Sequence, residues 1–241
     1  EVDALETSAA AGTIHCFAAG NDRSSSGMDS NTKDLQNSPE SITVAAMGSD
    51  GTYASYSCFG ACVFVTSPSS SSKTGCYGIT TTDRTGESYG YNGSGDSFPN
   101  SDYTSQFGGT SSATPLVAGV LALVKQVQPA LNTRFAKHLL VKTCTIVDSG
   151  DSTTASDGGW KTNGAGNKFN QNYGFGLINA DGLTTESVKN FGVTDLTTQD
   201  RSETDLGLAI PDNKTSGVSR TFSMSATTPL EEVVVTVDVT H

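Results

Sequence analysis

The chain has 241 residues, and its 25 acidic and 14 basic side chains give a formal net charge of -11, which argues against binding to nucleic acid. Only 16% of the residues are charged and 26 are glycine, a composition typical of a compact, turn-rich protein. No apolar stretch is long enough to span a bilayer and no signal peptide is visible, so we expect no membrane contact. The length suits one domain and part of another.

Helical and strand patterns alternate along most of the chain. We expect the last part of a helix near 2–11 and strands near 13–18, 41–46 and 63–66. We also expect long helices over 112–127 and 133–143 and a short helix over 181–189. Asn132 or Thr133 can cap the second long helix. Strands that alternate with buried helices favour a largely parallel sheet covered on both faces. This chain alone would leave sheet edges and apolar surface uncovered, so we expect a companion chain or a longer parent protein.

The most informative motif is GTSSATP, which runs from Gly109 to Pro115 and leads into the apolar run LVAGVLALV. Gly109 permits a tight turn that sets Ser111 at or beside the N-cap of a buried helix, with Pro115 in its first turn. Free amides and the helix dipole at this end would stabilise an oxyanion next to Ser111. An ordinary capped core helix is the simpler interpretation, but the whole seven-residue motif ahead of a buried helix favours a nucleophile.

GTSSATPLVAG is similar to the nucleophile motif of the subtilases, the subtilisin-like serine proteases. The resemblance implies a serine endopeptidase that hydrolyses peptide bonds through an acyl-enzyme, with Ser111 as the nucleophile. FAAGND, from Phe17 to Asp22, resembles the strand and turn that carry the oxyanion-hole asparagine of this family, and the matching residue is Asn21. An asparagine is common in such turns for backbone reasons alone, but the paired motifs favour the functional role.

Two later segments resemble the kexin and proprotein-convertase branch. Residues 160–180 are similar to the end of its catalytic domain, and residues 210–222, with the alternating valines that follow, resemble the opening of its β-sandwich P domain. The resemblance implies an α/β fold in which 1–190 form the C-terminal part of a doubly wound, mostly parallel subtilase sheet. Residues 191–241 would then be the truncated start of a P domain. Only the tract between about 66 and 106 matches poorly.

A serine nucleophile needs a histidine as base and a carboxylate that orients this histidine. The chain order of subtilisins, Asp then His then Ser, puts both upstream of Asn21, and only 20 residues precede Asn21 here. None of His15, His138 and His241 fits the role of the base. We therefore expect the chain to be inactive alone and to need the N-terminal portion of the same protease, as well as a protein or peptide substrate.

Two other function classes remain open. The first is a catalytically dead subtilase-like module that binds or chaperones, against which the intact Ser111 and Asn21 argue. The second is a structural, β-rich secreted module in which the P domain is the working part. A serine-directed label would distinguish an active enzyme from either module.

The five cysteines suit an oxidising compartment and a secreted or extracytoplasmic protein. Cys58, Cys62 and Cys76 cluster around the poorly matched tract, so we predict a disulfide among them. Cys16 and Cys144 lie in apolar patterns, and we predict that they are buried thiols.

The resemblance to the kexin branch also implies a calcium ion held by hard oxygen ligands, although no ligand can be assigned. Enzymes of this branch favour basic residues before the cut and use acidic pocket residues beside a calcium ion. The alignment puts Lys33 near a pocket aspartate and Cys58 where an acidic calcium ligand often stands. A slip of one residue would put Asp34 in place of Lys33, so both alternatives stay open and dibasic cleavage is not supported.

Overall fold

A computed structural model describes residues 1–92, 96, 98–189, 192–194, 196–200, 202, 219, 221–223, 230–231 and 233–235. The chain divides into two units, Glu1–Val193 and Thr194–His241. In the second unit the described residues belong to no helix or strand, and this includes the first three residues of the predicted valine strand, 233–235. The rest of that strand and most of residues 210–222 lie outside the described residues.

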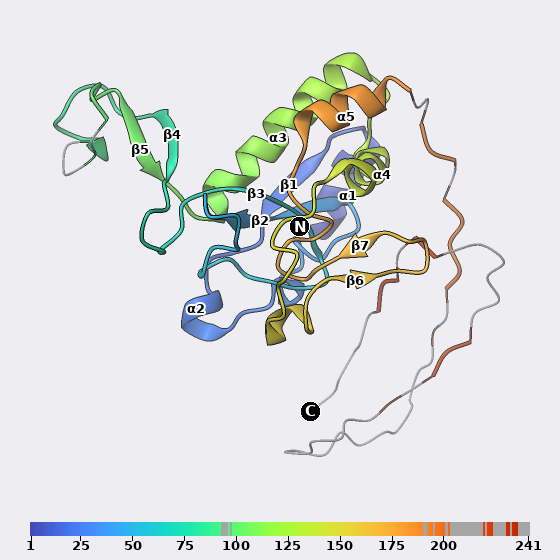
Figure 1. Ribbon diagram of the computed structural model, residues 1–241. Helices are drawn as coiled ribbons and strands as arrows, with labels where there is room; N and C mark the ends of the chain where they lie inside the picture. Colours follow the sequence, from blue (N-terminus) through green and yellow to red (C-terminus); the bar gives the residue numbers. More distant parts are fainter. Residues whose placement is uncertain are drawn as a thin grey trace. The chain divides into compact units, whose positions relative to one another are not determined.

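A three-stranded parallel sheet forms the centre of the first unit (Figure 1). Its order is β1 (His15–Ala18), β2 (Ser41–Met47) and β3 (Val63–Pro68). Every residue of β2 is buried, because this central strand has both faces covered. Ile42, Val44 and Ala46 belong to the main core. A smaller core consists of Ala19, Ala45, Cys58 and Val63. The predicted parallel sheet and its three strands are confirmed.

Helices pack against one face of this sheet (Figure 1). They are α3 (Thr110–Val127), α4 (Thr133–Thr143) and α5 (Ala180–Ser187), while α1 (Val2–Ala10) precedes β1 and the short α2 (Arg23–Ser26) follows it. The predicted cap of α4 is confirmed, since the Asn132 side chain accepts a hydrogen bond of 2.8 Å from the Phe135 amide. Helix side chains in the main core are Val117, Leu121, Val124, Phe135, Leu139, Leu140 and Leu183.

The prediction that the helix after the GTSSATP motif is buried holds for only one side of α3. Leu116, Leu123 and Val127 are 38%, 54% and 47% exposed. They recur at the spacing of one helical face, so α3 presents an apolar stripe that nothing in the described part of the chain covers. In the described residues, no helix is both long and apolar enough to cross a membrane.

The poorly matched tract contains a structure that the sequence patterns did not predict. β4 (Ile79–Thr82) and β5 (Tyr103–Phe107) pair antiparallel in a hairpin that stands apart from the parallel sheet (Figure 1). A second small pair, β6 (Lys161–Thr162) and β7 (Lys168–Phe169), follows α4, and single 3-10 turns lie at Ser30–Thr32 and Thr154–Ser156.

The predicted disulfide among Cys58, Cys62 and Cys76 is wrong, because all five cysteines are free thiols in the structure. The Cys58 side chain is fully buried in the smaller core, which keeps it away from the loop that contains Cys76. The prediction that Cys16 and Cys144 are buried thiols holds in part, since both pack against the main core but are only partly buried. Burial raises the pKa of Cys16 to about 11 and that of Cys144 to about 12.

Candidate active site

Gly109 sets the direction in which α3 begins. It is the N-cap residue and has a φ of 78°, a conformation that side-chain-bearing residues rarely adopt. Ser111 is therefore the second residue of α3 rather than its cap, and it is exposed. Pro115 lies in the second turn, not in the first turn as predicted, and cannot donate a hydrogen bond to the carbonyl of Ser111.

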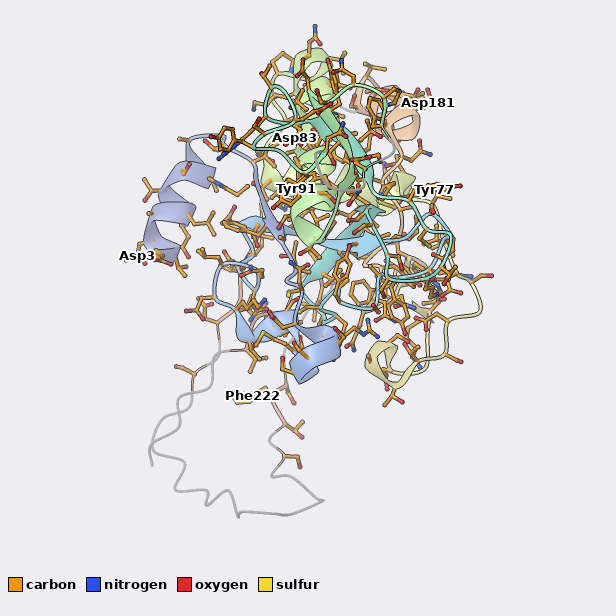
Figure 2. The ribbon with its side chains drawn as sticks, turned by 90° about the vertical axis from the view of Figure 1, so that its left-hand side faces the viewer. Asp3, Tyr77, Asp83, Tyr91, Asp181 and Phe222 are labelled. Carbon is orange, nitrogen blue, oxygen red and sulfur yellow. The ribbon has the colours of Figure 1, made fainter. Side chains whose placement is uncertain are left out.

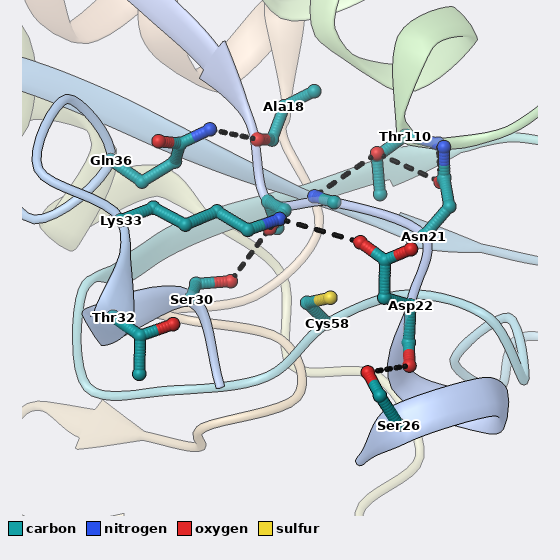
Figure 3. A network of polar contacts seen from close by, with 12 residues as sticks. Ala18, Asn21, Asp22, Ser26, Ser30, Thr32, Lys33, Gln36, Cys58 and Thr110 are labelled. Atoms are coloured by element: carbon teal, nitrogen blue, oxygen red, sulfur yellow. Dashed lines mark hydrogen bonds and ion pairs between the residues drawn. The ribbon is translucent and has the colours of Figure 1, made fainter. Parts of the chain in front are cut away.

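Thr110 connects the predicted nucleophile to the predicted oxyanion donor (Figure 3). Its amide and its hydroxyl donate hydrogen bonds of 2.9 Å and 3.0 Å to Oδ1 of Asn21. The amide of Gly20 donates to the same hydroxyl at 3.3 Å. The structure thus brings Asn21 to the start of α3, one residue from Ser111, although 89 positions separate Asn21 from Thr110 in the chain.

These contacts determine how the Asn21 amide is oriented. Because its oxygen accepts from Thr110, its Nδ2 group is left to donate elsewhere, and Asn21 is exposed. Gly109 lies close by, since a Cβ added there would lie 3.4 Å from Nδ2 of Asn21. Two donors therefore lie at the start of α3, the Asn21 side chain and the helix amide of Ser111.

A set of buried and half-buried hydroxyl groups contacts the start of α3 on the side away from the cavity. Tyr56 accepts from the Gly109 amide at 3.1 Å and donates to the carbonyl of Ser70 at 2.6 Å. Ser69 donates to the carbonyl of Gly109 at 2.8 Å, and its hydroxyl lies 2.6 Å from that of Ser112. The backbone around Ser111 is therefore fixed by side chains from the segment that follows β3 and from Tyr56.

Arg23 anchors the segment that follows Asn21. Its guanidinium donates to Oδ1 of Asn172 at 2.6 Å and lies 4.0 Å from the centre of the Tyr53 ring. Asn172 in turn donates to the carboxylate of Asp151 at 2.8 Å. Burial lowers the pKa of Arg23 from its ordinary value. The Asn21 turn is thus held at two points, by Thr110 at Asn21 and by Asn172 at Arg23.

Lys33, and not Asp34, lies beneath the Asn21 turn (Figure 3). Its ammonium donates to the carbonyl of Ala19 at 3.3 Å and pairs with Asp22 at 3.7 Å, whereas Asp34 is exposed. A Cβ added to Gly20 would lie 3.1 Å from the buried sulfur of Cys58. A cationic amine and a soft thiol do not fit a calcium ion, which needs hard oxygen ligands. In the described residues no group of three His, Cys, Asp or Glu side chains could hold a metal ion.

Neither of the two histidines among the described residues, His15 and His138, belongs to this set of contacts. Nε2 of His15 lies 3.0 Å from the Ser8 hydroxyl, and its ring stacks on that of Phe17. His138 lies in α4, which packs against α5 and β2. His241 lies outside the described residues. The structure therefore brings no described histidine into hydrogen-bonding contact with Ser111.

A cavity of about 290 Å³ opens directly at the predicted nucleophile. Its lining is Tyr91, Thr104, Gln106, Phe107, Gly108 and Ser111. A larger cavity of about 530 Å³ lies between α1 and the connection from α3 to α4, and none of its lining residues belongs to the site described above. We therefore regard the smaller cavity as the one relevant to chemistry at Ser111.

Sequence reasoning missed several residues that build this site. Thr110 stands inside the GTSSATP motif, so its position next to Ser111 could have drawn attention to it. Tyr56, Ser69 and Tyr91 carry no local signal, because their contacts with the helix start or the cavity are made only through the tertiary fold.

Comparison with known proteins shows which family the chain resembles. The family model described as Subtilase family matches residues 1–176. The extracellular serine protease of Aeromonas sobria is 33% identical over 165 residues, which cover 58% of this chain and 26% of that protein. The crystal structure of the Aeromonas sobria serine protease in complex with a chaperone is similar, with a TM-score of 0.75 and 26% identity over 89% of this chain and 44% of that one.

Two further relatives match different lengths of the chain. A calcium-dependent protease of Trichormus variabilis is 33% identical over 244 residues, which cover 95% of this chain and 32% of that protein. Human proprotein convertase subtilisin/kexin type 6 is 44% identical over 81 residues, which cover 34% of this chain and 8% of that protein. The chain thus spans no more than about a third of the length of these relatives. Because the family model covers most of its residues, the chain belongs to the subtilase family of serine proteases.

Proposed function

We propose that this chain carries the nucleophile and the oxyanion hole of a secreted serine endopeptidase, with Ser111 as nucleophile and Asn21 as oxyanion donor. The observation that carries the proposal is the pair of hydrogen bonds from Thr110 to the Asn21 oxygen, which holds Asn21 at the residue before Ser111 and leaves its Nδ2 group to donate elsewhere. Serine endopeptidases need these two groups side by side.

In this mechanism the Ser111 hydroxyl oxygen attacks the carbonyl carbon of the scissile peptide bond while a histidine accepts its proton. The carbonyl oxygen becomes an oxyanion that accepts hydrogen bonds from Nδ2 of Asn21 and from the Ser111 amide. The C–N bond then breaks, the histidine returns the proton to the departing amine, and an acyl-enzyme remains on Ser111. Water hydrolyses this ester and regenerates the serine.

The catalytic histidine and aspartate are proposed to come from the N-terminal portion of the same protease. Two surfaces of the described residues suit such a partner. The stripe of Leu116, Leu123 and Val127 on α3 is apolar and uncovered, and β1 pairs only with β2 among the described strands. A contact that covers the stripe and extends the sheet would bury both surfaces.

The finer classification is also a proposal. The 44% identity over 81 residues with the human convertase supports a kexin-like catalytic part over 1–190. The start of a P domain over 191–241 rests only on the resemblance of residues 210–222 and the valines that follow. The names of the relatives support secretion and a calcium requirement of the longer protease. The Lys33 ammonium argues against an acidic pocket at its position and hence against a preference for basic residues there.

Labelling with a fluorophosphonate, which reacts with activated serines, tests the proposal. The longer protease that contains this chain should be labelled at Ser111, and the Ser111→Ala variant should not be labelled. Ser24→Ala, which changes an exposed serine of α2, is the matched control and should be labelled normally.

Two outcomes would contradict parts of the proposal. If the longer protease stays unlabelled, the alternative of a catalytically dead binding or chaperoning module gains support. If the 241-residue chain alone cleaves peptides and loses this activity in Ser111→Ala, the base lies within the chain.

A further inference from the structure

Arg23 lies two residues after Asn21 and is held by contacts on several sides. Its guanidinium donates a hydrogen bond of 2.6 Å to Oδ1 of Asn172. The central carbon of the guanidinium lies 4.0 Å from the centre of the Tyr53 ring and 5.2 Å from that of Phe59, so the cation also interacts with two aromatic rings. An arginine that is fixed in this way restricts the position of the turn that precedes it.

The partners of Arg23 are themselves held by buried groups. Asn172 is 1% exposed, and its Nδ2 donates to the carboxylate of Asp151 at 2.8 Å. The Asn172 amide thus lies between a cation and an anion, with its oxygen toward the guanidinium and its nitrogen toward the carboxylate. The amide of Tyr53 donates at 2.8 Å to the hydroxyl of Tyr173, which is fully buried. Arg23 therefore contacts groups that other hydrogen bonds already hold in place.

Tyr56 connects the Arg23 side of the turn to the start of α3. The Arg23 amide donates to the Tyr56 carbonyl at 3.2 Å, and the Tyr56 hydroxyl accepts from the Gly109 amide at 3.1 Å. The turn that contains Asn21 and the turn that precedes Ser111 are consequently attached to the same residue.

A second cation near this turn, Lys33, holds it less firmly. Its ammonium lies 3.3 Å from the carbonyl oxygen of Ala19 and 3.7 Å from the carboxylate of Asp22, whose side chain is 53% exposed. A partly exposed ion pair of this length contributes little to stability. Of the two cations, Arg23 makes the shorter hydrogen bond and has the more buried partner.

From this geometry we propose that Arg23 is a positioning residue for the oxyanion donor, which fixes the turn so that Asn21 stays in place at the residue before Ser111. This role rests on the proposed function, because it acts through Asn21. Methionine in place of Arg23 would keep an unbranched apolar stem near Tyr53 but would lose the donor to Asn172. The Asn172 oxygen would then lack this partner in the buried interior, and the turn would lose its fixed attachment.

The rate at which a fluorophosphonate labels Ser111 in the longer protease tests this role. The phosphoryl oxygen of the probe takes the place of the oxyanion, so the rate reports how well Asn21 is placed. Arg23→Met should lower the rate about tenfold. In an Asn21→Ala background the same change should lower it less than about twofold, because the donor that Arg23 positions is absent. If Asn21→Ala itself slows labelling and Arg23→Met then costs the same factor in both backgrounds, Arg23 only stabilises the fold and the positioning role is overturned.

Hydrogen exchange at the Thr110 amide gives a second measurement, which needs no catalysis. This amide donates to Oδ1 of Asn21 at 2.9 Å, so its exchange reports whether Asn21 is in place. In the longer protease with Ser111→Ala, the additional change Arg23→Met should speed exchange at Thr110 about tenfold, while the amides of α4 keep their rates. Site-resolved mass spectrometry measures both.

Arg84→Met is the matched control. Arg84 is exposed and follows Asp83, which Figure 2 labels in the loop after β4. This change should leave both the labelling rate and the exchange at Thr110 as they are. Arg23→Lys keeps an ammonium that can donate to Asn172, so it should lose less than Arg23→Met in both measurements.

Exchange at Thr110 that is as slow in Arg23→Met as in Arg84→Met would overturn the positioning role. If Arg23→Met does not fold, Asn172→Leu removes the acceptor of Arg23 from the other side and decides by the same comparison. If exchange at Thr110 speeds up but Asn21→Ala leaves the labelling rate unchanged, the oxyanion role of Asn21 in the proposed function is overturned, and Arg23 still positions the turn.

Discussion

The two sides of Ser111 are built in different ways. Behind it, Tyr56, Ser69 and Ser112 are connected by hydrogen bonds across distant parts of the chain, and Thr110 is fully buried. In front of it, the hairpin loop is held by local bonds of its own residues, and Tyr91 is mostly exposed. The buried side fixes the geometry of the reacting groups, whereas the exposed side can vary in what it binds without disturbing them.

The largest effect is expected from Asn21, whose side-chain oxygen accepts two hydrogen bonds from the buried Thr110. We expect Asn21→Ala to lower kcat of the longer protease by about 10²–10³-fold, which is the magnitude known for the oxyanion-hole asparagine of subtilisin, a member of the same family. Asn37→Ala, which changes an exposed asparagine of the next loop, is the control. A loss of less than about threefold would remove Asn21 from the oxyanion hole.

The same variant should also lower stability, because the Thr110 amide and hydroxyl lose their acceptor. A cost of about 1–3 kcal/mol is expected for such unpaired donors, and urea unfolding of the Asn21→Ala chain measures it separately from turnover.

A smaller effect is expected from Tyr56, which supports the Gly109 turn. Tyr56→Phe keeps the ring but leaves the Gly109 amide and the Ser70 carbonyl without this partner. We expect the free energy of unfolding to fall by about 1–2 kcal/mol. Tyr89→Phe on the exposed hairpin should change it by less than about 0.5 kcal/mol. If both variants lose the same amount, the hydroxyl network behind Ser111 contributes nothing specific.

The smallest effect concerns how the stability of the β4–β5 hairpin depends on pH. Hydrogen bonds from Ser105 and Thr104 lower the pKa of Asp96 from 3.8 to about 2. Because the pKa is depressed in the folded hairpin, the stabilisation is present above the ordinary value and is lost as the pH falls from about 4 through about 2.

Amide hydrogen-exchange protection, corrected for intrinsic rates, should therefore fall in β5 over this range before it falls in α3. In Asp96→Asn this window should disappear. If α3 and β5 lose protection at the same pH, both in the unchanged protein and in Asp96→Asn, the hairpin does not open by itself.

Much of the fold could be predicted from the sequence because it depends on local patterns. The three parallel strands, the long helices and the Asn132 cap follow from apolar periodicity and short-range capping. The hairpin was missed because its strands are short and polar, with alternating partial exposure, and a long loop separates them. The disulfide prediction was wrong because nearness in sequence does not bring cysteines together in the fold.

For the site, the sequence by itself determined the residue types that chemistry needs, since Ser111 and Asn21 both stand in motifs of a few consecutive residues. Only the tertiary structure decided that Thr110 connects them, that Lys33 rather than Asp34 lies beneath the turn, and that Tyr91 reaches the cavity. These contacts join residues far apart in the chain, and their distances depend on how strands, loops and helix pack. A pattern of neighbouring residues contains no information on such packing.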